Sequence, residues 1–212
     1  MATATVRGES AVLVDPDEVA LRLTLTEVQQ TVDEAYEEVA KRAAKLSGVL
    51  SELGVDEAAR STSAVLMREE REYDERGRAV HRGFRATSST HVRLTDVSIV
   101  GTLIKQAVVG TSAQVEGPWW QATPENPARL EACRRAASVA RAKAEAYADA
   151  LGVRLGALSE VSEPDLRSIP RMATARYASF EPLMADSQEI PIESGALEIR
   201  AIVDVTFALE PN

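Results

Sequence analysis

Apolar and polar residues alternate along several segments of the chain, which is the pattern of strands that bury one face. The first alternating segment is residues 3–14, and a second one covers Val19, Leu21, Leu23 and Leu25. Asp15-Pro16-Asp17 separates the two segments and is typical of a turn. We therefore expect two strands joined by a tight turn.

A second pair of alternating segments is predicted to form a long hairpin. Residues 61–73 and 79–94 both have strand character, and residues 74–78, which contain Gly77, separate them. In the second segment the two histidines, His81 and His91, fall on the same parity, and the apolar residues fall on the other. Both histidines should therefore project from one face of the strand, since side chains alternate along it.

Two segments have the 3.6-residue period of an amphipathic helix. The first begins at Thr31, which forms a capping box with Glu34, and it ends at Gly54. Its expected buried stripe is Val32, Tyr36, Val39, Ala43, Leu46, Leu50 and Leu53. The second is a shorter helix within residues 95–110, with Val97, Val100, Leu103, Ile104 and Ala107 buried.

Residues 128–152 form a third predicted helix, which is rich in alanine. Thr123 is a plausible N-cap, and Pro124 and Pro127 are tolerated in a first helical turn. Steps of three and four define a stripe of Leu130, Cys133, Ala137, Ala140, Ala144, Tyr147 and Leu151. Because most of these residues are small, the stripe favours close approach of the helix backbone to a sheet over a coiled coil, whose seam needs large side chains.

The remaining segments complete the order of elements. Residues 111–122 predict a strand that Pro118 interrupts or places at an edge, and residues 153–161 and 197–209 predict two more strands. Residues 164–193 have no steady period and four prolines, and are expected to form a long loop. The order is ββ-α-ββ-α-β-α-β-loop-β, an α+β fold of antiparallel-rich sheets covered by three helices. We expect a single domain over residues 1–212, with 1–94 and 95–212 as the alternative subdivision.

Composition narrows the classes of function. The net charge of −9 arises from 24 basic and 33 acidic residues that are interleaved, so a nucleic-acid partner is not expected. No apolar run is long enough for a membrane-spanning segment. The start of the chain shows no signal-peptide pattern, so we expect a cytoplasmic protein, or a periplasmic or secreted one whose leader has been removed.

Candidate chemistry is sparse. His81 and His91 would stand about 33 Å apart at about 3.3 Å per residue, too far to share a metal ion or a substrate. The sequence has no nucleophile elbow and no glycine-rich phosphate loop. We therefore expect no catalytic residues, no metal and no cofactor. Cys133, the single cysteine, is interpreted as a small core residue, with a redox-sensing thiol as the alternative.

Several features are suited to contacts between proteins. Trp119 and Trp120 are adjacent in a predicted strand, so one can fill the core while the other meets a loop or a subunit. Met172, Tyr177 and Phe180 of the long loop are further candidate interface residues. The charged hairpin tip, residues 68–78, is interpreted as a guard against unwanted strand pairing, with an interaction site as the alternative.

Three segments together resemble the SIMPL domain family. They are "TVRGES...VDPDEVALRLTLT" near the start, "ARLEACRRAASVARAKAEAYADALGVRLGALSEV" in the alanine-rich helix and the following strand, and "IPIESGALEIRAIVDVTFAL" at the end. The resemblance implies an α+β, non-enzymatic protein. It also implies relatives that include bacterial periplasmic immunogenic proteins, a mammalian kinase-associated protein, links to oxidative-stress tolerance, and at least one ring- or channel-like oligomer.

Three hypotheses of function follow. The first is a non-enzymatic protein that associates with itself and acts in assembly or stress. The second is a module that binds a small molecule or peptide in a cleft between helices and sheet, with residues 164–193 as a lid. The third is a thiol-based stress protein that acts through Cys133.

Overall fold

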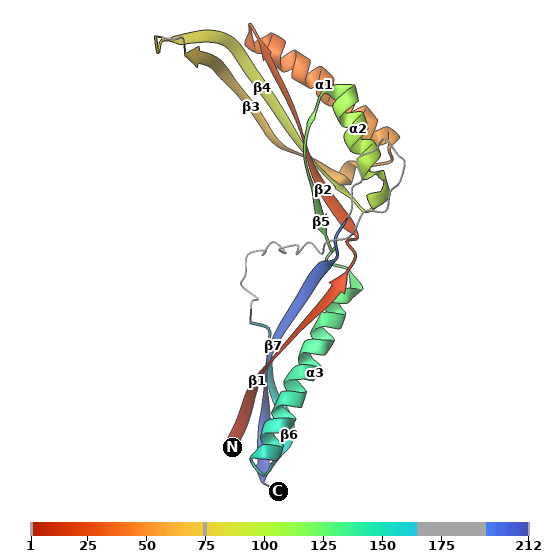
Figure 1. Ribbon diagram of the computed structural model, residues 1–212, viewed down its shortest axis with the longest axis vertical. Coiled ribbons are helices and arrows are strands. Elements are labelled where there is room, and N and C mark those ends of the chain that lie inside the picture. Colours follow the sequence, from red (N-terminus) through yellow and green to blue (C-terminus); the bar gives the residue numbers. More distant parts are fainter. Residues whose placement is uncertain (1, 74–75, 165–193, 212) are drawn as a thin grey trace. The chain divides into compact units, whose positions relative to one another are not determined.

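The computed structural model describes residues 2–73, 76–164 and 194–211 (Figure 1). The chain is an α+β protein whose described residues form two antiparallel sheets and three α-helices, and these elements follow the predicted order. They form two compact units. The central unit comprises residues 17–121. The terminal unit comprises the described residues of 2–16, 122–164 and 194–211.

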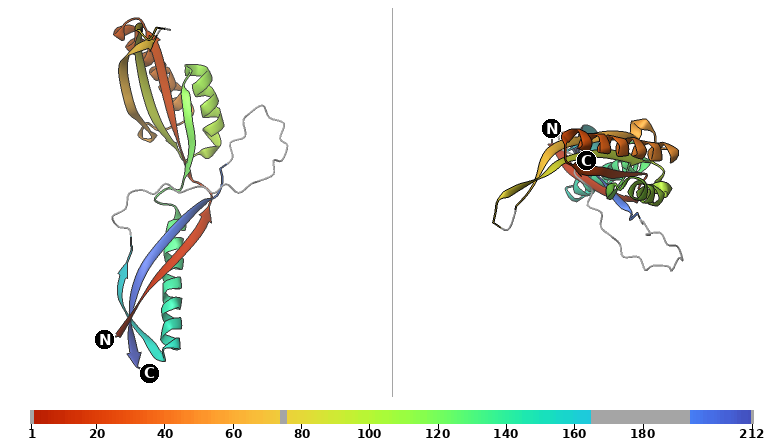
Figure 2. Two further views of the ribbon diagram at one scale, coloured as in Figure 1. Left: turned by 60° about the vertical axis from the view of Figure 1, so that its left-hand side comes forward. Right: turned by 90° about the horizontal axis from the view of Figure 1, so that it is seen from above.

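The central unit is a four-stranded sheet of order β3-β4-β2-β5, with two helices on one face (Figures 1 and 2). Its strands are β2 (Glu18–Gln29), β3 (Arg60–Tyr73), β4 (Ala79–Leu94) and β5 (Gln114–Gln121). Its helices are α1 (Val32–Glu52) and α2 (Val100–Thr111), each next to a short 3-10 turn, Glu57–Ala59 and Val97–Ile99. Alternate β2 residues fill the core beneath the helices, where Leu21, Leu23 and Leu25 are almost fully buried.

Helix α1 begins as the sequence predicts. The Glu34 amide donates to Thr31 Oγ1 and the Thr31 amide donates to the Glu34 carboxylate, both at 3.2 Å, which satisfies two amides that have no partner in the first turn. The predicted stripe is correct at Val39, Leu46 and Leu50, which are buried together with Ala35. It is wrong at Val32 and Tyr36, which are exposed.

The predicted hairpin of residues 61–94 is confirmed as β3 and β4, and β5 is an edge strand. The pairing of β3 with β4 slips twice, between Thr62 and Ala64 and between Glu70 and Arg71. Such bulges add one residue to one strand and reverse which face the following side chains occupy.

The terminal unit is a three-stranded sheet of order β1-β7-β6 with α3 on one face. Its elements are β1 (Ala2–Val14), α3 (Pro127–Ala150), β6 (Val153–Ser162) and β7 (Leu197–Pro211). β1 pairs with β7 over its whole length, from Ala2 opposite Leu209 to Val14 opposite Leu197. The two strands predicted on either side of residues 15–17 are confirmed, but β1 and β2 belong to different sheets, so the turn between them does not close a hairpin. Residues 15–17 carry the chain from one unit to the other.

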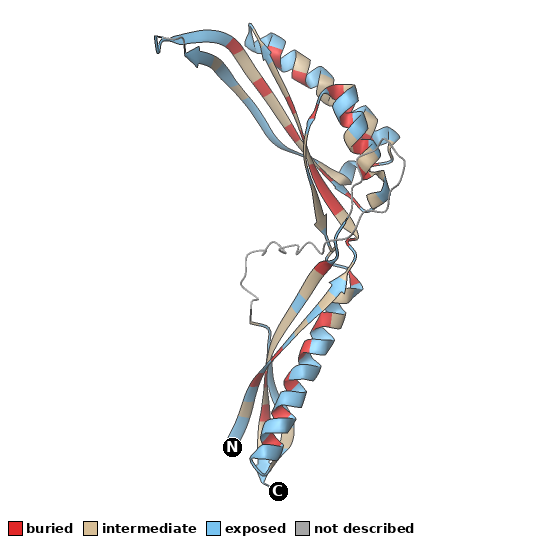
Figure 3. Ribbon diagram, viewed as in Figure 1, coloured by how far each residue is buried: buried red, intermediate tan, exposed pale blue. Residues whose placement is uncertain are grey.

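Helix α3 packs through small residues, as predicted, and the predicted stripe is correct at Ala140 and Ala144 but wrong at its other residues. The buried residues are spaced by four and are all alanines: Ala132, Ala136, Ala140, Ala144 and Ala148 (Figure 3). The helix begins at Asn126, whose side chain accepts from the Ala128 amide at 3.0 Å, and not at Thr123. Ser10 Oγ of β1 donates to the Ala132 carbonyl at 2.6 Å, so strand and helix backbones lie close together.

Candidate functional site

The two tryptophans of β5 point to opposite faces of the central sheet, as expected. Trp120 lies opposite Val19 and packs against the core beneath the helices. Trp119 lies opposite Ala20 and stacks on the ring of His91, with centroids 6.5 Å apart and planes 21° apart. Both indoles are half-buried within the central unit. Whether either residue also contacts a partner stays a prediction.

A polar cluster surrounds Trp119 on the outer face, the face of the central sheet that α1 and α2 leave uncovered. The Arg22 guanidinium lies 5.8 Å from the Trp119 ring centroid. Its Nε donates to His91 Nε2 at 3.1 Å, and its Nη1 donates to Glu116 Oε2 at 3.2 Å. Since a guanidinium can only donate, His91 Nε2 is the acceptor, and the neutral ring therefore has its proton on Nδ1.

Hydroxyl groups line the outer face beyond this cluster. Thr24 and Ser89 bond through their hydroxyls at 3.0 Å, and Ser63 Oγ donates to the Ser89 carbonyl at 3.2 Å. The Thr24 and Ser89 hydroxyls therefore satisfy each other across the strands, while the Ser63 hydroxyl bonds to the backbone of β4.

The two histidines do not share a face of β4, which corrects the prediction. The bulge opposite Glu70 and Arg71 moves His81 to the side of Phe84, where the two rings meet edge to face at 5.2 Å. His81 Nδ1 lies 2.9 Å from Glu69 Oε1. Hydrogen bonds from Arg71 and His81 hold the pKa of Glu69 below its ordinary value. Across the described residues, no three His, Cys, Asp or Glu side chains gather as metal ligands would.

Cys133 is exposed, not buried as predicted. It directly follows the buried Ala132, and the rotation of about 100° per helical residue carries its side chain away from the sheet. The interpretation of Cys133 as a core residue is therefore wrong, and the thiol is open to solvent.

The remaining predicted contact residues, Met172, Tyr177 and Phe180, lie outside the described residues. So does the loop 164–193 beyond its first residue. Within the described part of the chain, none of the helices combines the length and the apolar character that crossing a membrane requires.

One surface that sequence reasoning did not single out is the free edge of β3. From Ser61 to Leu66 every residue of this strand is exposed. Val65 is 64% exposed and Leu66 51% exposed, and none of the residues 61–67 is charged. The sequence of this segment predicts a strand from its alternation, and alternation does not reveal which strand lies at an edge.

A crevice runs beside this edge, between α1 and β3. It holds about 130 Å³ and is lined mainly by apolar side chains: Tyr36, Val39, Ala40, Ala43, Val65, Met67 and Ala86, together with Thr87 and Ser88. The crevice exists because α1 packs on β2 and β4 and leaves β3 uncovered. Tyr36, at 59% exposure, and Val65 flank it. Because the start of α1 borders this crevice and no strand of the described chain covers it there, Tyr36 stays exposed and the predicted stripe of α1 is wrong at that residue.

Comparison with known proteins identifies relatives over nearly the whole chain. Residues 4–207 match the family described as SIMPL, "Protein of unknown function (DUF541)". The chain is 26% identical over 213 residues to the "26 kDa periplasmic immunogenic protein" of Brucella melitensis biotype 1, a match that covers 97% of this chain and 84% of the relative. The protein of the same name from Brucella abortus strain S19 matches with the same identity and coverage.

Proposed function

The chain belongs to the SIMPL family, and we propose that it is a non-enzymatic protein that assembles with copies of itself through the edge of β3. The observation that carries the proposal is the combination of a free strand edge with exposed apolar side chains and no charge over residues 61–67. Edge strands normally avoid pairing through charges, prolines, bulges or covering elements. Residues 61–67 contain one bulge, between Thr62 and Ala64, but no charge and no proline, and no element of the described chain pairs with their outer edge.

A second copy of the same strand fits this edge. Antiparallel pairing of β3 with itself about a twofold axis near Ala64 would set residues 61–67 of one copy against residues 67–61 of the other. No charges would meet along that stretch, and identical patches would face each other, as in most homodimers. The charged residues that follow, from Arg68 to Glu72, would limit the pairing to the neutral segment.

The crevice beside β3 supports the same arrangement. Its volume of about 130 Å³ is below the 300–1,000 Å³ typical of small-molecule sites, so a few side chains suffice to fill it. Side chains of a second copy that reach over Val65 and Tyr36 would cover apolar surface that water now contacts. Burial of that surface favours association.

Light scattering across a range of protein concentrations tests the proposal. The wild-type chain should show a mass of at least twice its 22.9 kDa. Val65→Lys should shift the protein toward the monomer, because a lysine on an edge strand opposes pairing. Val109→Lys is the matched control, since Val109 is 80% exposed on α2 and away from the edge. A wild-type monomer at high concentration would refute the proposal.

We further propose a compartment for the protein and a second candidate function. Both relatives are named as periplasmic proteins, which favours the periplasm over the cytoplasm as the compartment, and cell fractionation tests this.

The exposed thiol of Cys133 supports a second candidate function in oxidative stress. In that case a Cys133→Ser strain should lose peroxide tolerance that the wild-type strain retains.

A further inference from the structure

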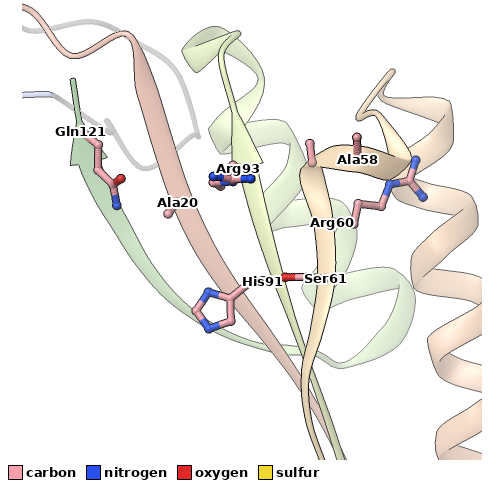
Figure 4. A pocket seen from close by; sticks show the side chains of 8 residues that line it. Ala20, Ala58, Arg60, Ser61, His91, Arg93 and Gln121 are labelled. Carbon is pink, nitrogen blue, oxygen red and sulfur yellow. The ribbon is translucent and has the colours of Figure 1, made fainter. Parts of the chain in front are cut away.

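A second hollow lies on the outer face of the central sheet, where the first residues of β2 and β3 meet the last residues of β4 and β5 (Figure 4). It holds about 300 Å³, at the lower end of the range for small-molecule sites. Its lining residues are Ala20, Ala58, Ala59, Arg60, Ser61, His91, Arg93 and Gln121. All of them belong to the central unit.

Arg93 distinguishes this hollow from the rest of the sheet. Other arginines of the sheet form ion pairs: Arg22 with Glu116, Arg82 with Glu72 and Arg85 with Glu70. Arg93 is exposed and forms neither an ion pair nor a hydrogen bond with any described residue. A guanidinium is a positively charged group with five N–H donors and no acceptor.

The other polar side chains of the hollow also have donors to offer. His91 accepts from Arg22 at Nε2, which leaves an N–H at Nδ1 in the neutral ring. The hydroxyl of Ser61 and the side-chain amide of Gln121 form no hydrogen bond within the described part of the chain. Donors from three strands thus line one hollow, and Figure 4 shows Ser61, His91, Arg93 and Gln121 around it.

Among the described residues no carboxylate lines the hollow, although the whole chain has a net charge of −9. Glu18 lies beside the hollow by register, opposite Gln121, and Asp56 and Glu57 directly precede the lining residues Ala58 and Ala59 in the chain. No ion pair joins Glu18 to Arg93 within the described residues. A site that presents a guanidinium and several neutral donors, without an acceptor that carries charge, is complementary to an oxyanion.

We propose that this hollow binds a small molecule through an anionic oxygen group, a phosphate or a carboxylate, with Arg93 as its charged contact. Ser61, His91 and Gln121 donate to the remaining oxygens, and Ala20, Ala58 and Ala59 contact the apolar part of the ligand. The hollow and the pairing segment of β3 share Ser61, whereas Val65, the position changed to test assembly, does not line the hollow.

Nuclear magnetic resonance on the full-length chain tests this site with simple probes. Sodium phosphate and sodium acetate are titrated separately, with the ionic strength held constant by sodium chloride. The account predicts saturable shifts of the Arg93 Nε–H signal and of the Ser61, His91 and Gln121 amides with at least one of the two anions. Saturation by phosphate alone would assign the site to phosphate esters, and saturation by acetate alone would assign it to carboxylates.

Variants distinguish binding of the anion at this hollow from a general attraction of anions to exposed arginines. Arg93→Gln should weaken binding about tenfold or more, because a hydrogen bond to a charged group is lost. Arg154→Gln removes an exposed arginine in the terminal unit and should leave binding unchanged. Val65→Lys should bind as the wild type does, whatever its oligomeric state. Shifts that do not saturate with either anion, or that persist in Arg93→Gln, would overturn the proposal.

Discussion

Gly8 of β1 lies against Ala136 of α3 so closely that a Cβ atom at Gly8 would be 1.9 Å from the Ala136 carbonyl oxygen. The same atom would be 2.8 Å from the Ala140 amide nitrogen. Both contacts are with backbone, which cannot swing aside as a side chain can. The glycine and the row of alanines therefore form one feature, a helix seated directly on a strand.

Gly8→Ala should consequently destabilise the protein. We expect a loss of about 3 kcal/mol in the free energy of unfolding, because the helix must move away from the strand. Urea denaturation followed by circular dichroism measures the change. Gly48→Ala is the control, since Gly48 lies within α1 with nothing within 4 Å of an added Cβ, and it should stabilise by about 0.5–1 kcal/mol. Equal effects of the two substitutions would contradict the close approach.

Leucine at two adjacent positions distinguishes the observed stripe of α3 from the predicted one. Ala136 is fully buried, whereas Ala137 is exposed. Alanine and leucine have similar helix propensities, so packing decides the outcome. Ala136→Leu should cost about 2 kcal/mol or more through overpacking, and Ala137→Leu should change stability by less than about 0.5 kcal/mol. If Ala137→Leu were the damaging substitution, the stripe described here would be wrong.

The ion pair between Arg7 and Asp204 predicts that the stability of the folded protein falls in acid. Arg7 Nε donates to Asp204 Oδ1 at 2.8 Å, and this bond holds the pKa of Asp204 below its ordinary value. Because folding lowers the pKa of Asp204, the pair contributes its full stabilisation of the folded state above the ordinary pKa of about 3.9. This contribution is lost as the pH falls through the lowered pKa of the folded state. A carboxyl titration by nuclear magnetic resonance should show a higher pKa for Asp204 in Arg7→Gln. An unchanged titration would mean that the pair does not persist in solution.

Cys133 should react in the native protein. Because its side chain is exposed, a thiol reagent should label one group per chain without denaturant. Cys133→Ser provides the blank for the same assay. Labelling that occurs only in denaturant would show that Cys133 is covered, and it would also remove the proposed role in oxidative stress.

The sequence was sufficient to predict the order and type of the elements because each one has a clear period. The capping box at Thr31 and the opposite faces of Trp119 and Trp120 follow from local rules and are confirmed. Strand partners do not follow from local rules. β1 pairs with β7, which lies almost two hundred residues away, and a turn signal at residues 15–17 does not tell a hairpin from a link between two sheets.

Two finer predictions are wrong because a local pattern in the sequence does not fix which face of a helix or strand a side chain occupies. In α3, alanines occupy the observed stripe and also much of the surface, so hydrophobicity does not tell Ala136 from Ala137 or place Cys133. In β4, alternation predicts one face for both histidines, but one bulge reverses the face of His81. The hollow at Arg93 depends on which arginines lie beside an acidic residue in the folded chain, and only three-dimensional neighbours reveal that.

Amide hydrogen exchange along β3 tests the central claim, assembly through this edge, most directly. In an edge strand alternate amides point away from the neighbouring strand and exchange freely, whereas a second copy paired along the edge would protect them. The account predicts that the outward amides between Ser61 and Met67 gain protection as the protein concentration rises, and that Val65→Lys abolishes this gain. Free exchange of these amides at every concentration, while the inward amides of β3 stay protected, would contradict it.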